Sequence, residues 1–325
     1  MTAPLVSFVL LAFNQERFVE EAIRGALAQD YARLEIVLSD DASADGTYAV
    51  MERVAATYTG PHRIVLNRTT GGGGTLAHLL EAATRSAGEL IVVGAGDDIA
   101  YPHRVSRLAA KWQRTRATAL FSGFHQIGDD GQRLSPEAAF PRSDYDPSPL
   151  FPHSHARQIA GASAAYDRRL LDALLTPLTP VLAEDYFLSL MTAWSMGAVA
   201  AIAEPLLAYR IHAQALTSAG EDLLGVEAFE RKSARSAERA RDILRLFESL
   251  VQSGGGWRIP PPALAKVDPD RLRREIEYLD YRAKWMDMPV GRRIRSALAF
   301  RDPAQLRWLL PRLFGPRLLA ALKRN

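Results

Sequence analysis

The chain contains no cysteine among its 325 residues. Disulfides, thiolate zinc sites, iron–sulfur clusters and cysteine nucleophiles are therefore excluded, and a reducing compartment fits this composition. No apolar run reaches the roughly 18 residues that a membrane-spanning helix needs. The apolar stretch at residues 3–13 is short and no basic residue precedes it, which predicts a buried strand rather than a signal peptide. We expect a cytoplasmic protein.

Charge is distributed unevenly along the chain. Residues 1–220 carry 18 Lys and Arg against 23 Asp and Glu, whereas residues 271–325 carry 14 against 5. The positive net charge of the chain therefore originates in its last segment. A basic segment on a mildly acidic body indicates a docking surface for an anionic partner.

Apolar runs of strand length alternate with helical patterns in the first part of the chain. These runs occupy residues 6–12, 34–38, 63–66 and 89–93. Strands that are separated by helices of about 10–15 residues indicate βαβ units. The expected fold class is α/β, with a Rossmann-like, mostly parallel central sheet and flanking helices.

Weaker strand patterns follow at residues 119–124, 198–203 and 206–211, the last two as separate short strands. Beyond residue 220 the patterns are helical only, and a Gly- and Pro-rich break separates two of them. We therefore predict two domains: residues 1–220 form an α/β domain, and residues 221–325 form a helical, basic C-terminal extension.

Polar residues follow the predicted strands at the points where these strands end. In an open parallel sheet, ligands bind beyond the carboxyl ends of the strands. This rule selects Asn14, Glu16, Asp40, Arg68 and the pair Asp97-Asp98.

Asp97 and Asp98 directly follow Gly96 at the end of an apolar strand. Two carboxylates at this point suit a hard divalent cation that keeps several waters and also binds substrate phosphates. A helix N-cap is the alternative interpretation, because a helical stretch follows Pro102. A cap explains one aspartate more readily than two.

Five segments share one pattern with a known family: VSFVLLAFN at 6–14, LEIVLSDDASADGT at 34–47, GDDIAYP at 96–102, AEDY at 183–186 and EPLLAYRIH at 204–212. In this order they resemble family-two glycosyltransferases of the GT-A fold. The resemblance covers about residues 4–217, and it implies that domain 1–220 is a GT-A nucleotide-sugar-binding and catalytic domain. It implies inverting transfer of a sugar from a UDP- or dTDP-sugar to a hydroxyl group.

The resemblance also implies roles for the first two strand ends. The residue that matches Asp40 contacts the nucleobase, and the segment with Ala12, Phe13, Asn14 and Glu16 lines the same pocket. A carboxylate can accept the ring N–H of uracil or thymine, which cytosine lacks. An ordinary turn with an Asp cap remains the alternative for Asp40.

Asp97 and Asp98 match the metal motif of the family, so Mn²⁺ or Mg²⁺ is the expected cofactor. The motif usually has a further aspartate at the position of Ala95, and this departure leaves open which carboxylate binds ribose and which binds metal. The resemblance adds His212 as a third metal ligand and Arg210 near the diphosphate. A structural role for His212 is equally compatible with the sequence. Arg68 is a further candidate for the diphosphate or a solvated surface residue.

Asp185 matches the catalytic base of the family. An inverting displacement needs a carboxylate that removes the proton of the acceptor hydroxyl. Glu184 competes for this role, because neighbours on a helix point in different directions. Both could instead be first-turn residues that the helix dipole favours.

The basic tail contains the run Arg292-Arg293-Ile294-Arg295, followed among further arginines by Leu306, Trp308, Leu309, Leu310, Leu313, Phe314, Leu318 and Leu319. This composition is typical of an interfacial helix that lies on an anionic membrane. Packing onto the body or onto the second subunit of a homodimer is the alternative. Few aromatics interleave the basic residues of the body, so nucleic acid is not an expected partner.

The resemblance therefore implies a metal-dependent, inverting glycosyltransferase of surface-polysaccharide synthesis that acts on a glycan or lipid-linked acceptor, at the inner face of the membrane if the tail docks there. One alternative is a nucleotidyltransferase, although the loop at residues 14–17 lacks the Gly-rich sequence expected of one. The other is a catalytically silent protein that binds glycan or nucleic acid.

Overall fold

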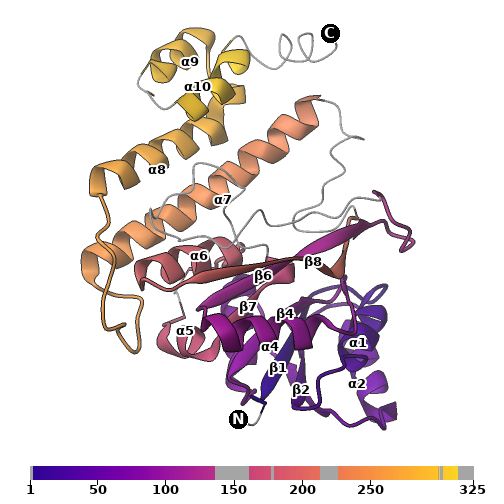
Figure 1. Ribbon diagram of the computed structural model, residues 1–325. Helices are drawn as coiled ribbons and strands as arrows, with labels where there is room; N and C mark the ends of the chain where they lie inside the picture. The colour runs from indigo at the N-terminus through magenta and orange to yellow at the C-terminus, as the bar shows by residue number, and fades with distance from the viewer. Residues whose placement is uncertain are drawn as a thin grey trace. The chain divides into compact units, whose positions relative to one another are not determined.

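The computed structural model describes residues 3–135, 161–176, 179–212, 226–298, 300 and 303–313 (Figure 1). The chain divides into two compact units. Unit 1 comprises Met1–His212 and Gly256–Lys266, and unit 2 comprises Ala213–Gly255 and Val267–Asn325. The domain boundary predicted near residue 220 falls in the stretch 213–225, outside the described residues.

Unit 1 is built on one eight-stranded sheet with the strand order β3-β2-β1-β4-β7-β6-β8-β5. Strands β1 to β4, β6 and β8 run in one direction, whereas β7 and β5 are antiparallel to their neighbours. The predicted mostly parallel central sheet is therefore confirmed. The strands are β1 Val6–Ala12, β2 Leu34–Asp40, β3 Arg63–Arg68, β4 Leu90–Ala95, β5 Ile99–Ala100, β6 Ala119–Ile127, β7 Ala165–Asp167 and β8 Val199–Arg210.

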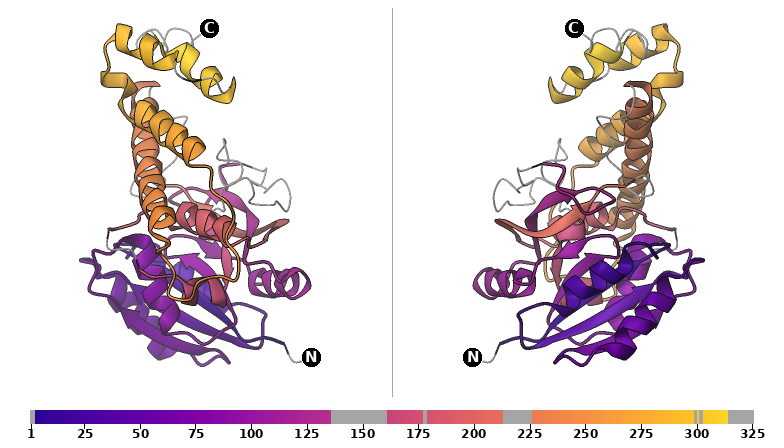
Figure 2. Two further views of the ribbon diagram at one scale, coloured as in Figure 1. Left: turned by 90° about the vertical axis from the view of Figure 1, so that its left-hand side faces the viewer. Right: turned by 90° about the vertical axis from the view of Figure 1, so that its right-hand side faces the viewer.

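Helices cover both faces of the sheet (Figures 1 and 2). Alternate apolar residues of β1, β2 and β4 form a core with α1, α2 and α4 on one face. Helix α3 packs on the other face, where its His78 bonds Ser39 of β2. The helices of unit 1 are α1 Val19–Leu27, α2 Thr47–Thr57, α3 Gly74–Thr84, α4 Arg104–Thr115, α5 Arg168–Ala173 and α6 Glu184–Trp194, with the 3₁₀ turn η2 Gly161–Ser163.

The register of the parallel strands places their carboxyl ends level with one another. Ala12 pairs with Asp40, Asp40 pairs with Arg68, and Leu11 pairs with Ala95. The loops after β1, β2, β3 and β4 therefore leave the sheet from one edge, which we call the carboxyl edge.

The prediction of two short strands at residues 198–203 and 206–211 is wrong. Residues 199–210 form the single strand β8 rather than two short strands. Its pairing with β6 shifts register between Ser122 and His125, opposite the segment that contains Pro205. Proline lacks an N–H donor for the ladder, so the sequence signals a break where the strand only becomes irregular.

Unit 2 is helical in its described part. Its elements are α7 Val226–Ser253, α8 Pro269–Lys284, η3 Trp285–Asp287, α9 Val290–Ala297, α10 Pro303–Leu309 and η4 Leu310–Arg312. Tyr278, Tyr281, Trp285, Ala297 and Leu309 form its aromatic core. No helix in the described ranges is both long enough and apolar enough to span a bilayer.

Candidate active site

Asp40 ends β2 at the carboxyl edge, and its side chain is completely buried. Its Oδ2 accepts a hydrogen bond from the Ser43 backbone N–H at 3.0 Å and lies 3.1 Å from Nε of Arg68. Its Oδ1 has no partner among the described residues. A buried acceptor without a donor is costly, so a ligand N–H at this position would satisfy it.

Arg68 lies over the ring of Tyr48 and also donates to the Ser43 carbonyl at 2.9 Å. The structure thus places Arg68 beside Asp40, where it holds the turn after β2. Through these two bonds Arg68 positions the Asp40 carboxylate.

The loop after β1 is bonded to the loop after β2. Asn14 has a positive φ of 51° and donates its backbone N–H to Ser43 Oγ at 2.9 Å. Its side chain accepts from the Ala44 N–H at 2.8 Å, and Glu16 accepts from the Gly46 N–H at 2.9 Å. These bonds close one side of the Asp40 turn.

Ala12 is buried at the end of β1, whereas 56% of the Phe13 surface is exposed. Phe13 follows Ala12, which pairs with Asp40 in the sheet, and its exposed ring offers a face on which a planar base can stack. The four residues predicted to line the pocket, Ala12, Phe13, Asn14 and Glu16, are therefore brought to the Asp40 turn.

Asp97 and Asp98 follow β4 and point to different surroundings. Asp97 Oδ2 lies 3.0 Å from His212 Nε2. Asp98 is buried and accepts the Arg210 backbone N–H at 2.7 Å through Oδ1. Burial, together with the charge of Asp97, raises the pKa of Asp98 well above its usual range.

Asp98 Oδ2 is buried without a partner in the described part of the chain. Gly96 is required nearby, because a Cβ there would lie 2.6 Å from the Cβ of Ala12. The backbone after β4 therefore passes directly against the end of β1.

The described residues contain no group of three or more His, Cys, Asp or Glu side chains that could hold a metal ion. Asp97 and His212 nevertheless form a carboxylate–imidazole pair, and both are metal-ligand types. A divalent cation that takes its other ligands from water and phosphate fits such a pair. Asp98 faces the protein interior, and its bond to Arg210 ties β4 to β8.

Arg210 is almost fully buried. Its guanidinium donates to the carbonyls of Asp97, Gly128 and Asp129 at 2.9, 3.1 and 3.0 Å and to Glu21 at 2.5 Å. All of these guanidinium hydrogen bonds go to groups of the protein itself. Arg210 joins the loop after β4, the turn after β6 and helix α1.

Glu184 and Asp185 form the first turn of α6 and are half-buried. Asp185 accepts the Gly161 N–H at 3.2 Å and the Tyr186 N–H at 2.7 Å. Burial raises the pKa of Asp185. Burial and the neighbouring charge of Asp185 raise the pKa of Glu184 to about 7.

The start of α6 is held near the start of α3. Gly74 begins α3 with a φ of +77°, and a Cβ there would lie 2.8 Å from the Val181 carbonyl oxygen. Leu76 donates its N–H to that carbonyl at 3.2 Å. Because α3 follows β3 from the carboxyl edge, Asp185 belongs to the same edge as Asp40 and Asp97.

Arg104 is a buried residue of this region that the sequence did not reveal. Its guanidinium donates to the carbonyls of Val93 and Ala162 at 2.6 and 2.8 Å. The first belongs to β4 and the second to η2, whose Gly161 donates to Asp185. The pKa of Arg104 falls to about 10 because of burial, so the group stays charged at neutral pH.

The sequence profile of Glycosyl transferase family 2 matches residues 7–175. The chain belongs to this family. The matched range contains the first four strands, the Asp40 turn and the Asp97-Asp98 pair, and it ends before Asp185.

Two curated relatives show the extent of the family likeness. The "Putative glycosyltransferase EpsE" of Bacillus subtilis is 31% identical over 145 residues, which cover 43% of this chain and 51% of EpsE. The chain therefore spans about half the length of EpsE. The "Succinoglycan biosynthesis protein ExoO" of Rhizobium meliloti is 26% identical over 326 residues, which cover 91% of this chain and 88% of ExoO.

Two solved structures show the same fold, confirming the predicted GT-A class. TarS 1–349 of S. aureus, in complex with UDP-GlcNAc, has a TM-score of 0.57 at 14% identity and covers 96% of this chain and 82% of its own. The mannosyltransferase PcManGT of Pyrobaculum calidifontis, in complex with GDP-Man and Mn²⁺, has a TM-score of 0.54 at 18% identity and covers 99% and 87%.

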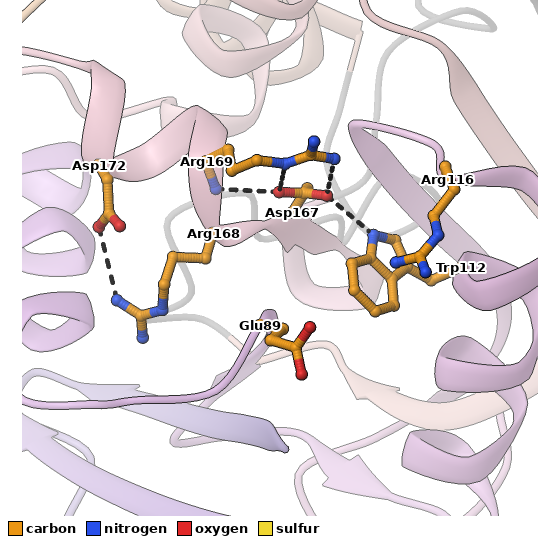
Figure 3. A pocket seen from close by; sticks show the side chains of 7 residues that line it. All are labelled: Glu89, Trp112, Arg116, Asp167, Arg168, Arg169 and Asp172. Atoms are coloured by element: carbon orange, nitrogen blue, oxygen red, sulfur yellow. Dashed lines mark hydrogen bonds and ion pairs between the residues drawn. The ribbon is translucent and has the colours of Figure 1, made fainter. Parts of the chain in front are cut away.

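A pocket of about 490 Å³ lies away from this family site (Figure 3). Asp167 pairs with Leu90, the first residue of β4, so the pocket opens at the edge opposite the carboxyl edge. Its charges largely pair with one another: Asp167 bonds Arg169 at 2.7 Å, and Asp172 lies 3.5 Å from Arg168. These ion pairs give the charged residues of the pocket a structural role.

Proposed function

We propose that this member of glycosyl transferase family 2 is a metal-dependent, inverting glycosyltransferase. It transfers a sugar from a UDP- or dTDP-sugar to a hydroxyl group of a glycan or lipid-linked acceptor in surface-polysaccharide synthesis. The observation that carries this proposal is the gathering of Asp40, Asp97 and Asp185 at the carboxyl edge of one sheet.

The nucleobase binds at the Asp40 turn. The unpartnered Oδ1 of Asp40 accepts a ring N–H, while Ser43 and Arg68 hold the carboxylate in place through its Oδ2. The exposed ring of Phe13 offers the stacking surface. Glu16 and Asn14 fix the loop around the base.

The diphosphate binds next to the Asp97–His212 pair. These two residues would hold the divalent cation, either Mn²⁺ or Mg²⁺, and Asp98 fixes the loop that carries Asp97 by accepting the Arg210 backbone N–H of β8. When bound, the cation offsets the negative charge that develops on the leaving diphosphate.

Asp185 serves as the base. It removes the proton of the acceptor hydroxyl while that oxygen forms a bond to the anomeric carbon and the carbon–diphosphate bond breaks. Attack from the face opposite the leaving group inverts the anomeric configuration. Gly161 and Tyr186 donate to the two oxygens of Asp185 and orient the carboxylate.

The acceptor class is proposed from ExoO, whose name gives a role in succinoglycan biosynthesis. The UDP-sugar is proposed from the Asp40 acceptor and from the ligand of the TarS structure. We also retain a homodimer as a proposed assembly.

A thermal-shift panel of nucleotide sugars tests the proposal. UDP- or dTDP-sugars with Mn²⁺ should raise the melting temperature, and CDP-sugars should not. An equal response in EDTA would contradict the metal requirement, and the absence of any response would contradict the donor class.

A further inference from the structure

We infer that helix α9 of unit 2 is a docking surface for an anionic lipid bilayer. The inference goes beyond sugar transfer and does not depend on it. It rests on three exposed aliphatic side chains, two unpaired arginines and the way the helix is anchored to its own unit.

The outer face of α9 carries an apolar stripe. Val290, Ile294 and the adjoining Leu298 are 43%, 39% and 79% exposed. Their spacing of four residues keeps all three within roughly 80° on the helical wheel. We call these three residues the α9 stripe.

The inner face of α9 fixes the direction of this stripe. Arg293 and Ala297 are buried, and Arg293 donates to the carbonyls of Trp285 and Met286 at 2.8 and 3.1 Å. Ala297 belongs to the aromatic core of unit 2. The helix therefore cannot rotate its stripe inward without breaking buried hydrogen bonds.

Positive charge lies beside the stripe. Arg295 and Arg292 follow it around the helix on the side away from the buried face, and both are exposed. Neither side chain forms a hydrogen bond or an ion pair with any residue that the structure describes. Aliphatic side chains beside unpaired arginines match the arrangement of helices that lie in the headgroup region of anionic membranes.

This assignment narrows the docking surface within the basic tail that composition favoured. Leu306, Trp308, Leu309 and Leu313 pack in or against the aromatic core of unit 2. Leu310 is 60% exposed, and Phe314, Leu318 and Leu319 lie outside the described residues. Docking is thus assigned to α9, which carries the run 292–295 of that tail.

A second copy of the chain fits this face less well than lipid does. Three aliphatic side chains supply far less than the roughly 800 Å² per partner of a stable interface. A two-fold contact would also bring identical arginines together, and like charges repel. Lipid phosphates instead complement these arginines.

Vesicle flotation with the full-length chain tests the inference. The protein should float with vesicles of phosphatidylcholine and phosphatidylglycerol at low salt and should not float with pure phosphatidylcholine. The double variant Ile294→Asp/Leu298→Asp should bind at least about tenfold more weakly. The double variant Arg292→Gln/Arg295→Gln should lose about fivefold per arginine.

Matched controls use exposed residues of unit 1. Ile259→Asp introduces the same type of change at a position that is 60% exposed, and Arg85→Gln/Arg114→Gln removes the same charge. Both controls should bind as the unaltered chain does. Failure of the unaltered chain to float, or equal binding of the α9 variants, would overturn the inference.

Sedimentation of the same proteins identifies the competing occupant. A dimer that Ile294→Asp/Leu298→Asp dissociates, with no vesicle binding by the unaltered chain, would assign the stripe to a second copy and overturn the lipid assignment. Because flotation needs no sugar transfer, its failure and the failure of the proposed activity can be told apart.

Discussion

Glu184 and Asp185 are adjacent carboxylates, yet their surroundings differ. Asp185 accepts two backbone N–H groups, from Gly161 and Tyr186, whereas burial and the neighbouring charge of Asp185 raise the pKa of Glu184 to about 7. Backbone donors on both oxygens orient a carboxylate and favour its ionised form. This difference supports Asp185 as the base and Glu184 as its neighbour.

Exchange of each carboxylate for its amide separates their roles. Asp185→Asn should lower kcat at least about 100-fold, because the acceptor proton loses its base. The affinity for UDP should remain nearly unchanged. Glu184→Gln is the matched control and should keep most of the activity in the same steady-state assay. The reverse order of effects would contradict the assignment.

The pKa of Glu184 predicts how stability depends on pH. The folded chain holds this proton up to about pH 7, whereas the unfolded chain loses it near the ordinary value of 4.5. The protonated Glu184 therefore stabilises the folded chain fully below pH 4.5, and this contribution is lost as the pH rises to about 7. Because Glu184 keeps contact with water, we expect the contribution to the free energy of unfolding to be about 1 kcal/mol.

Urea unfolding at pH 4.5 and pH 7.5 measures this effect. The unaltered chain should lose stability relative to Glu184→Gln as the pH rises. A difference between the two proteins that is the same at both pH values would show that Glu184 titrates normally.

Asp40 gives a prediction about base selectivity. Asp40→Asn keeps the size of the side chain but replaces one acceptor oxygen by a donor. We expect the affinity for UDP to fall by about tenfold or more, because the ring N–H then meets a group that cannot accept it. Calorimetric titration of UDP and CDP measures this. An unchanged preference for UDP over CDP would show that the nucleobase does not bind at Asp40.

At the scale of elements, the carboxyl edge is assembled by loops that bond to one another. Arg104 at the start of α4 links β4 to η2, and η2 donates to Asp185. A substitution in α4 can therefore disturb the base without touching substrate.

Arg104→Met should leave the carbonyls of Val93 and Ala162 without their donor, at a cost of about 2–4 kcal/mol in unfolding free energy. Among molecules that remain folded, kcat should fall more than KM changes. Arg104→Lys should restore part of kcat, because it returns one donor. Arg114→Met, at an exposed position of the same helix, is the control. Unchanged kcat in Arg104→Met would show that this link has no role in positioning Asp185.

The elements that could be predicted from the sequence are those whose own residues form a recognisable local pattern. Strands β1, β2 and β4 are apolar runs, and their parallel register follows from the helices between them. The break expected within β8 was wrong, because Pro205 resembles a terminator although the chain continues through it. Arg104 and Gly161 carry no local pattern, since their importance arises from partners about 24 to 58 positions away.

At the scale of the molecule, the charge asymmetry was visible in the sequence but its arrangement was not. Trp308 and Leu309 suggested a free apolar face, yet they pack in unit 2 with Tyr278 and Trp285. Which apolar residues of a tail remain exposed depends on tertiary packing, and periodicity alone cannot decide it. The exposed stripe lies instead on α9.

The central claim is that the donor binds at the carboxyl edge with a divalent cation. Calorimetric titration of UDP into the full-length chain, with Mn²⁺ and again with EDTA, tests it most directly. The account predicts that EDTA and Asp97→Ala each weaken binding at least about tenfold. Asp172→Ala, in the pocket at the opposite edge, should change nothing. Equal affinity in EDTA, or loss of binding in Asp172→Ala but not in Asp97→Ala, would contradict the account.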